Sequence, residues 1–263
     1  MSFQSTLDRP ASSKITDAMR AIPIAALLAF GAQAQTEPWP LIQVSRRPGV
    51  DASSIRPYVD ARAAVNVLGI ASITGPAESW LIATHDSFSS IEAVDKAIRS
   101  LGPVRTADPM ELPGDMFAVS RSLIAFYRPA FSYRAEQAIG MFPRARYVYA
   151  TIYRIRPGAE PEFAELVKSR RGALDSINMD RPEIAYQVIS GAASGTYLFL
   201  APLTSLKSLD DGMAKAPAYV ESGKTGSSEI NRIHFLFRVE PGMSYVSDEF
   251  ASADAEFWRS KAQ

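Results

Sequence analysis

The sequence predicts an α+β fold made of two copies of one module, each with the element order β-α-β-β-α-β. Three observations lead to this prediction. A strand pattern closed by Arg-Pro-Gly occurs twice, ending at Gly49 and Gly158, and the patterns that follow each turn come in the same order. Each half also ends on an apolar strand that leads into a proline and then a Ser-Tyr pair, at Ser132 and Ser244. The turns are 109 residues apart and the Ser-Tyr pairs 112, which is the spacing of a repeated module with small loop changes.

Each half opens with a strand, predicted at 41–49 and 149–158, and continues with a helix, two strands, a second helix and a last strand. The helices are expected where apolar residues recur every three or four positions behind a capping Asp or Ser or an early proline, and the strands where apolar and polar residues alternate. In the first half these elements are placed at residues 51–63, 69–74, 79–85, 89–101 and 123–133. In the second half they are placed at residues 161–176, 183–190, 196–201, 205–213 and 235–245.

The way the two modules pack is predicted from one strand. In the segment 147–155 one face carries Tyr147, Tyr149 and Tyr153, and the other carries small aliphatic residues. We expect the aliphatic face to meet the helices, because an exposed face of tyrosines would form a large half-apolar patch. The two sheets are then predicted to pack on each other within one chain as an intramolecular dimeric α+β barrel with a tyrosine-rich interior.

The N-terminal residues 1–34 have the pattern of a signal peptide. An apolar run at 21–31 follows Lys14 and Arg20 and precedes Ala32-Gln33-Ala34, which predicts cleavage before Gln35 and export to the periplasm or the extracellular space. Met19 is an alternative start, and a buried N-terminal helix is the alternative structure. The run is too short to span a bilayer, so no stable membrane span is expected in the mature chain.

We place the modules at 39–134 and 146–247 and a helical tail at 248–263.

The composition excludes several classes of function. The 28 basic and 28 acidic residues cancel, so the chain has no positive field for nucleic acid or an anionic membrane. There is no cysteine, which removes thiolate nucleophiles and cysteine metal sites, and two histidines leave little material for an imidazole site. We therefore predict no metal and no cofactor.

The repeated features resemble the dimeric α+β barrel superfamily, whose members pair two ferredoxin-like modules through their sheets. The resemblance covers residues 39–247 and is carried by Arg156-Pro157-Gly158 with the helix after it, by Tyr127-Arg128-Pro129 with Ser132-Tyr133, and by the tail 248–258. The chain is most similar to exported tandem-barrel proteins of unknown activity, and more loosely to NIPSNAP-like and antibiotic-biosynthesis-monooxygenase-like groups. The superfamily includes monooxygenases, lactone isomerases, chlorite-decomposing haem enzymes and ligand-sensing domains, so the resemblance implies a fold and no particular reaction.

The candidate catalytic residues are His234, Arg238, Tyr149 and Tyr153. His234 shares a strand face with Arg238, and an imidazole there could act as a base or bind haem iron, or it could be a hydrogen-bonded structural histidine. The alternation leaves open whether this face or the opposite one, with Phe235 and Phe237, lines the interior.

The candidate ligand-binding residues are aromatic or imidazole side chains on predicted strands: Tyr147, Tyr149, Tyr153, Tyr186, Trp80 and His85. Equally, the tyrosines could only fill the space between the sheets. Trp80 and His85 invite comparison with haem-degrading relatives, but Asn66 falls at the end of a helix, so that motif is not reproduced and haem is only an alternative.

Two classes of function follow. The first is an exported protein that binds a small apolar or aromatic ligand between the sheets, or that acts through its surface, with homo-oligomers compatible with either. The second is a cofactor-free monooxygenase or isomerase in which tyrosine hydroxyls, with His234 or Arg238, polarise an aromatic or polyketide-like substrate.

Overall fold

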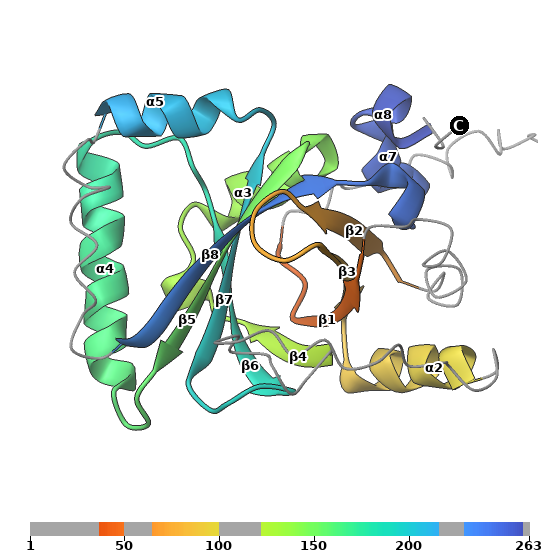
Figure 1. Cartoon of the computed structure of the whole chain (residues 1–263), viewed down its shortest axis with the longest axis horizontal. Helices are drawn as coiled ribbons and strands as arrows, with labels where there is room; N and C mark the ends of the chain where they lie inside the picture. The colour runs from red at the N-terminus through yellow and green to blue at the C-terminus, as the bar shows by residue number, and fades with distance from the viewer. Residues whose placement is uncertain (1–36, 50–64, 100–121, 216–228, 260–263) are drawn as a thin grey trace, which may run out of the picture. The chain divides into compact units, whose positions relative to one another are not determined.

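Eight antiparallel strands close into a barrel in this protein, whose computed structural model describes residues 37–49, 65–99, 122–215 and 229–259 (Figure 1). All of these residues belong to one compact unit that begins at Ala34. The strands are β1 (Leu41–Pro48), β2 (Val67–Ser72), β3 (Glu78–His85), β4 (Ser122–Tyr127), β5 (Tyr147–Ile155), β6 (Ile184–Ser190), β7 (Thr196–Leu203) and β8 (Glu229–Val239). Around the barrel they run β1-β3-β2-β8-β5-β7-β6-β4, and β4 pairs with β1 to close it.

The same strand order occurs in both halves of the barrel. The first half reads β4-β1-β3-β2, the second reads β8-β5-β7-β6, and the halves meet where β2 pairs with β8 and β4 pairs with β6. The predicted α+β class is confirmed, and each predicted strand has a counterpart. The central pairing of the second half places β5 between β7 and β8, in register from Tyr147 to Arg154 on both sides.

The helices cover the outside and one end of the barrel. They are α2 (Phe88–Arg99), α3 (Ala135–Met141), α4 (Glu160–Ser176), α5 (Lys207–Lys215), α7 (Asp248–Ser252) and α8 (Ala255–Arg259), with short 3-10 turns η1 (Pro129–Phe131), η2 (Phe142–Arg144) and η3 (Pro241–Met243). The predicted helix at 51–63 lies outside the described residues, and α3 was not predicted. None of the described helices is long and apolar enough to cross a membrane.

The tyrosine-rich interior is a wrong prediction. The barrel is filled by aliphatic residues and a few large aromatics: Ile42, Val44, Ile70, Trp80, Ile82, Ala125, Val148, Ala150, Ile152, Leu198, Leu200, Phe235 and Phe237. On β5 it is the small face that points inward, because Trp80 of β3 and Phe235 and Phe237 of β8 already occupy the narrow interior of an eight-stranded barrel.

The aromatic face of β5 lies on the outside instead. Tyr153 packs there with Tyr197 and Phe199 against Phe163 and Val167 of α4, which runs along the outer side of the barrel (Figure 1). Helix α4 therefore covers the part of the aromatic face that contains Tyr153, whereas Tyr147 and Tyr149 stay half-buried on the outside of the barrel.

The repeated Ser-Tyr pairs form two clasps of the same construction, the first clasp at residues 128–133 and the second clasp at residues 240–245. In the first, the Ser132 hydroxyl donates to the Arg128 carbonyl at 3.0 Å and accepts from the buried Ala185 N–H at 2.9 Å. In the second, the Ser244 hydroxyl donates to the Glu240 carbonyl at 2.8 Å and accepts from the Gly69 N–H at 2.9 Å. Each clasp thus joins the end of one half to a strand of the other half.

The C-terminal helices are fixed to the barrel beside the start of β5. The Trp258 indole N–H donates to the Pro143 carbonyl at 2.7 Å. Arg146 bonds Asp254 at 2.5 Å, and its guanidinium lies 3.8 Å from the centre of the Phe257 ring. The tail at 248–259 consequently forms part of the wall at this end of the barrel.

Candidate functional site

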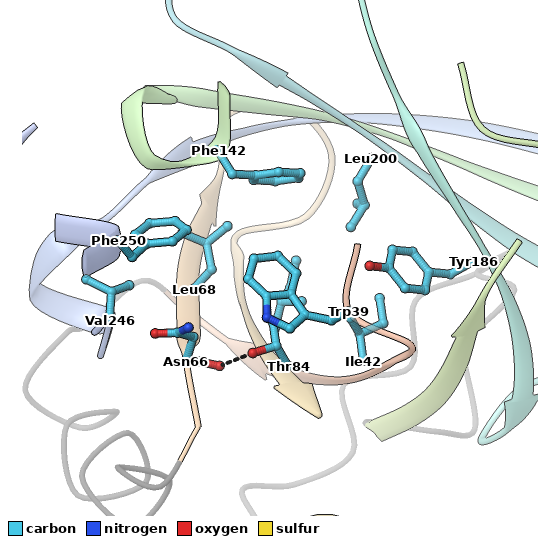
Figure 2. Close-up of a pocket in the computed structure, with 11 residues that line it drawn as sticks. Trp39, Ile42, Asn66, Leu68, Thr84, Phe142, Tyr186, Leu200, Val246 and Phe250 are labelled. Carbon is cyan, nitrogen blue, oxygen red and sulfur yellow. Dashed lines mark hydrogen bonds between the residues drawn. The ribbon is translucent and has the colours of Figure 1, made fainter. Parts of the chain in front are cut away.

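A pocket opens at the barrel end where β1 and β2 begin and β8 finishes (Figure 2). Its empty volume is about 450 Å³, a figure that includes space open to solvent. Three parts of the chain line it: the strands of the barrel, the segment before β1, and the turns and tail around β5 and β8. The lining residues are Trp39, Ile42, Asn66, Leu68, Ile82, Thr84, Phe142, Tyr186, Leu200, Val246 and Phe250.

The wall of this pocket is mostly apolar, and its polar groups are the indole N–H of Trp39 and the side chains of Thr84, Asn66 and Tyr186. The Thr84 hydroxyl donates to the Asn66 main-chain carbonyl at 3.3 Å, and the Asn66 side-chain oxygen accepts from the Ser247 N–H at 2.7 Å. The third, Tyr186, is fully buried, and Figure 2 shows its hydroxyl directed into the pocket without a hydrogen bond to any other lining residue. An apolar wall with one available hydroxyl is the usual composition of a small-molecule site.

The environment of Tyr186 keeps its hydroxyl protonated. Burial raises the pKa of this phenol above its usual value, and the nearby Tyr127 phenol raises it further. The two tyrosine rings lie 6.0 Å apart at their centres. Tyr186 is therefore a hydrogen-bond donor in the pocket over the whole range in which proteins are stable.

Of the six predicted ligand-binding residues, the structure brings only Tyr186 to this pocket. Trp80 lies deeper in the barrel, where its ring packs against Phe237 at 4.6 Å and its indole N–H donates to Glu78 at 3.0 Å. Glu78 also accepts two hydrogen bonds from the buried Arg46. The side chains of Arg46, Glu78 and Trp80 are thus hydrogen-bonded to one another, and they fill the barrel interior beyond the pocket. His85 is buried at the end of β3, with its Nδ1 2.9 Å from the Ser90 hydroxyl.

His234 and Tyr149 form a second cluster, on the outer face of the barrel. Their rings stack with centres 5.5 Å apart at an angle of 29°, and His234 Nδ1 lies 3.1 Å from the Thr151 hydroxyl on the neighbouring strand. The alternative placement of His234, away from the interior, is thus the one observed.

The other predicted residues of this face stand apart from that pair. Tyr153 packs under α4, Arg238 bonds Glu240 at 2.5 Å, and Tyr147 lies half-buried opposite Arg238 in the strand register. The predicted convergence of His234, Arg238 and the tyrosines on an internal cavity does not occur, because all of them point outward.

The electrostatics of this outer cluster disfavour a charged imidazole. Desolvation by its neighbours lowers the pKa of His234 to about 4, and the positive charges of Arg232, Arg170 and Arg181 act in the same direction, although the residue as a whole is exposed to solvent. Glu183 opposes them but is itself bound by Arg170, with a hydrogen bond of 2.9 Å from Nη2 to Oε2. His234 is therefore neutral at neutral pH.

Sequence reasoning missed most of the pocket. Trp39, Phe142, Val246 and Phe250 come from segments outside the regular strands, and nothing in their spacing indicates that they meet. The sequence signal nearest to it is the predicted helical tail at 248–263, which contains Phe250. Among the described residues no group of three or more His, Asp or Glu side chains could hold a metal ion.

No known protein family and no curated protein matches the sequence. Several solved structures have a backbone fold similar to that of this chain. A proposed monooxygenase from Fusobacterium nucleatum subsp. nucleatum is 9% identical, over 77% of this chain and 93% of its own, with a TM-score of 0.49. A heme-binding protein from Thermus thermophilus is 9% identical over 77% and 91%, with a TM-score of 0.45. A mutant of chlorite dismutase from Candidatus Nitrospira defluvii is 8% identical over 84% and 96%, with a TM-score of 0.46.

Proposed function

We propose that this protein binds a small apolar or aromatic molecule in the pocket at the end of its barrel. The observation that carries the proposal is the Tyr186 hydroxyl, which faces a mostly apolar pocket and has no partner among the lining residues. Because this hydroxyl donates to none of the lining residues, a ligand with a carbonyl or ether oxygen could accept a hydrogen bond from it. The ligand we expect is therefore neutral, largely apolar and equipped with one hydrogen-bond acceptor.

The pocket does not fit haem. Its eleven lining residues include no histidine, methionine or cysteine to bind the iron. Tyr186 could do so only as a phenolate, which the raised pKa of its hydroxyl opposes.

A cofactor-free monooxygenase or isomerase remains the second candidate, at the outer cluster. The stacking of Tyr149 with His234 favours it, because two of the groups assigned to that chemistry lie side by side. The lowered pKa of His234 counts against it, because it makes the imidazole a weak base at neutral pH. We rank it below ligand binding because Arg238 and Tyr153, the other residues assigned to that chemistry, do not join the pair.

We also propose that the mature protein is exported and consists of two tandem ferredoxin-like modules. The strand order of the two halves and the matching clasps support the tandem arrangement. The export proposal rests on the apolar run at 21–31 and the Ala32-Gln33-Ala34 sequence. The mass and N-terminal sequence of protein recovered from its host test it: we expect a chain that begins at Gln35, and a chain that keeps residues 1–34 contradicts export by this route.

Two measurements test the ligand pocket. Native mass spectrometry of protein from its own source is expected to show an added small-molecule mass. In vitro, the neutral fluorescent ketone 6-propionyl-2-dimethylaminonaphthalene serves as the probe, since it is apolar and has one carbonyl acceptor. Tyr186→Phe is expected to weaken its binding about 5- to 10-fold, because the variant loses one hydrogen bond and no volume. Leu200→Phe is expected to weaken it further by filling the pocket.

The matched control is Tyr197→Phe, which removes a hydroxyl from a buried tyrosine on the outer side of the barrel, under α4. Its affinity for the ketone is expected to equal that of the unmodified protein. Equal binding by the unmodified protein, Tyr186→Phe and Leu200→Phe would place the probe elsewhere and overturn the proposal, as would the absence of any binding.

A further inference from the structure

Besides the Tyr186 hydroxyl, the pocket at the end of the barrel contains a second hydrogen-bonding group on a fixed side chain, the amide of Asn66. Asn66 directly precedes β2 and is held by Thr84 and Ser247. Its main-chain carbonyl accepts from the Thr84 N–H at 2.9 Å and from the Thr84 hydroxyl at 3.3 Å. Its side-chain oxygen accepts from the Ser247 N–H at 2.7 Å. The amide is therefore held in one orientation at the wall of the pocket.

The hydrogen bond from Ser247 decides which end of the Asn66 amide is available to a ligand. A main-chain N–H can only donate, so the atom that it meets is the amide oxygen, and the –NH2 group takes the other position. Figure 2 shows this nitrogen on the side of the amide that faces the pocket, with no hydrogen bond to another lining residue. Asn66 therefore presents N–H donors to the pocket.

The available polar groups of the wall are donors. The Tyr186 hydroxyl, the Asn66 –NH2 group and the Trp39 indole N–H all line the pocket, and Figure 2 shows no hydrogen bond from any of them to another lining residue. The Thr84 hydroxyl donates to the Asn66 carbonyl instead. The eleven lining residues include no Asp, Glu, Lys, Arg or His, so an ionised ligand would find no opposite charge in the wall. Such a wall favours a neutral molecule with more than one acceptor.

The proposed function requires one acceptor, for the Tyr186 hydroxyl. We propose that the ligand carries a second neutral acceptor, the carbonyl oxygen of a ketone or ester, and that Asn66 selects for it by donating from Nδ2. This inference rests on the proposed function, since it concerns the same pocket. Because Thr84 and Ser247 already hold the amide, little side-chain entropy is lost when a ligand binds to it. Asn66 is thus a specificity-determining residue.

Competition against the fluorescent ketone of the proposed function measures this selectivity on the whole protein. Three competitors share a naphthalene ring with an acetyl group at position 2 and differ at position 6. 2,6-Diacetylnaphthalene has a second carbonyl, 2-acetyl-6-isopropylnaphthalene has a group of nearly the same shape without an acceptor, and 6-acetyl-2-naphthoate has a carboxylate at pH 7. We expect the diketone to bind about fivefold more tightly than the isopropyl ketone, and the naphthoate to bind more weakly than the diketone.

Asn66→Asp tests the residue itself. The variant keeps an oxygen for the Ser247 N–H and loses the –NH2 donors, so the preference for the diketone over the isopropyl ketone is expected to disappear or reverse. Asn178→Asp is the matched control, because it adds the same carboxylate at an exposed position after α4, outside the pocket lining. It is expected to keep the preference of about fivefold.

Three results would each overturn the second acceptor: equal binding of the diketone and the isopropyl ketone, a preference that persists in Asn66→Asp, and tighter binding of the naphthoate than of the diketone. The proposed function is judged separately. If the isopropyl ketone binds and loses affinity in Tyr186→Phe, the ligand pocket stands even where the second acceptor fails. If neither the fluorescent ketone nor any competitor binds, both proposals are wrong.

Discussion

The two clasps are built alike around serine and differently around tyrosine. Ser132 and Ser244 make the same pair of hydrogen bonds, one within the clasp and one to a strand N–H of the other half. Tyr133 is 3% exposed and donates to Asp175 at 2.8 Å, whereas Tyr245 is 37% exposed. The serine therefore joins the two halves of the barrel in both clasps, whereas the role of the tyrosine beside it depends on the residues around it.

The two clasps also differ in the strand residue that they hold. Ser132 accepts from Ala185, and Ser244 accepts from Gly69. A Cβ at position 69 would lie 2.4 Å from the Met243 carbonyl oxygen and 2.5 Å from the Met243 Cβ. The second clasp therefore lies so close to β2 that only glycine fits, and the first leaves room for a methyl group.

The largest effect is expected from Gly69→Ala. The added methyl group would collide with backbone that cannot rotate away, so we expect a loss of about 3 kcal/mol in the free energy of unfolding. Denaturant unfolding followed by circular dichroism measures it. Gly172→Ala is the control, because a Cβ at this exposed helical position meets nothing within 4 Å and should stabilise α4 by about 0.5–1 kcal/mol. Equal stability of Gly69→Ala and the unmodified protein would show that the second clasp adjusts freely.

The next effect tests whether the serines are equivalent. Ser132→Ala and Ser244→Ala each leave a buried strand N–H without its acceptor, which is expected to cost about 2 kcal/mol in either clasp. The same unfolding experiment compares them, with Ser252→Ala on the exposed helix α7 expected to change stability by less than about 0.5 kcal/mol. A loss in one clasp and none in the other would contradict the equivalence.

The smallest effect tests the difference between the tyrosines. Tyr133→Phe loses the hydrogen bond to Asp175 on α4, for which we expect about 1 kcal/mol. Tyr245→Phe removes a hydroxyl from an exposed side chain, and its free energy of unfolding should match that of the unmodified protein within about 0.5 kcal/mol. A larger loss from Tyr245→Phe than from Tyr133→Phe would reverse the comparison.

Much of the fold could be predicted from local patterns. Alternation and helical spacing located the strands and most helices, and the repeated Ser-Tyr pairs pointed to elements that turn out to share one hydrogen-bonding role. The direction in which a strand faces could not be predicted in the same way. On β5 both faces are apolar enough to be buried, so their contents do not say which one is inside, and the outcome depends on how much space Trp80, Phe235 and Phe237 leave in the barrel.

The candidate sites, like the fold, could be predicted from the sequence only in part. Tyr186 could be named as a ligand contact because it is a large polar aromatic on a strand, yet its pocket needs Trp39, Phe142 and Phe250 from distant segments. The stacking of His234 on Tyr149 likewise joins two strands that lie far apart in the sequence. Periodicity is a property of neighbours along the chain, so the sequence contains the elements and their repeat. Which faces are buried, and which side chains meet, depends on volumes and distances between elements, and these exist only in the folded protein.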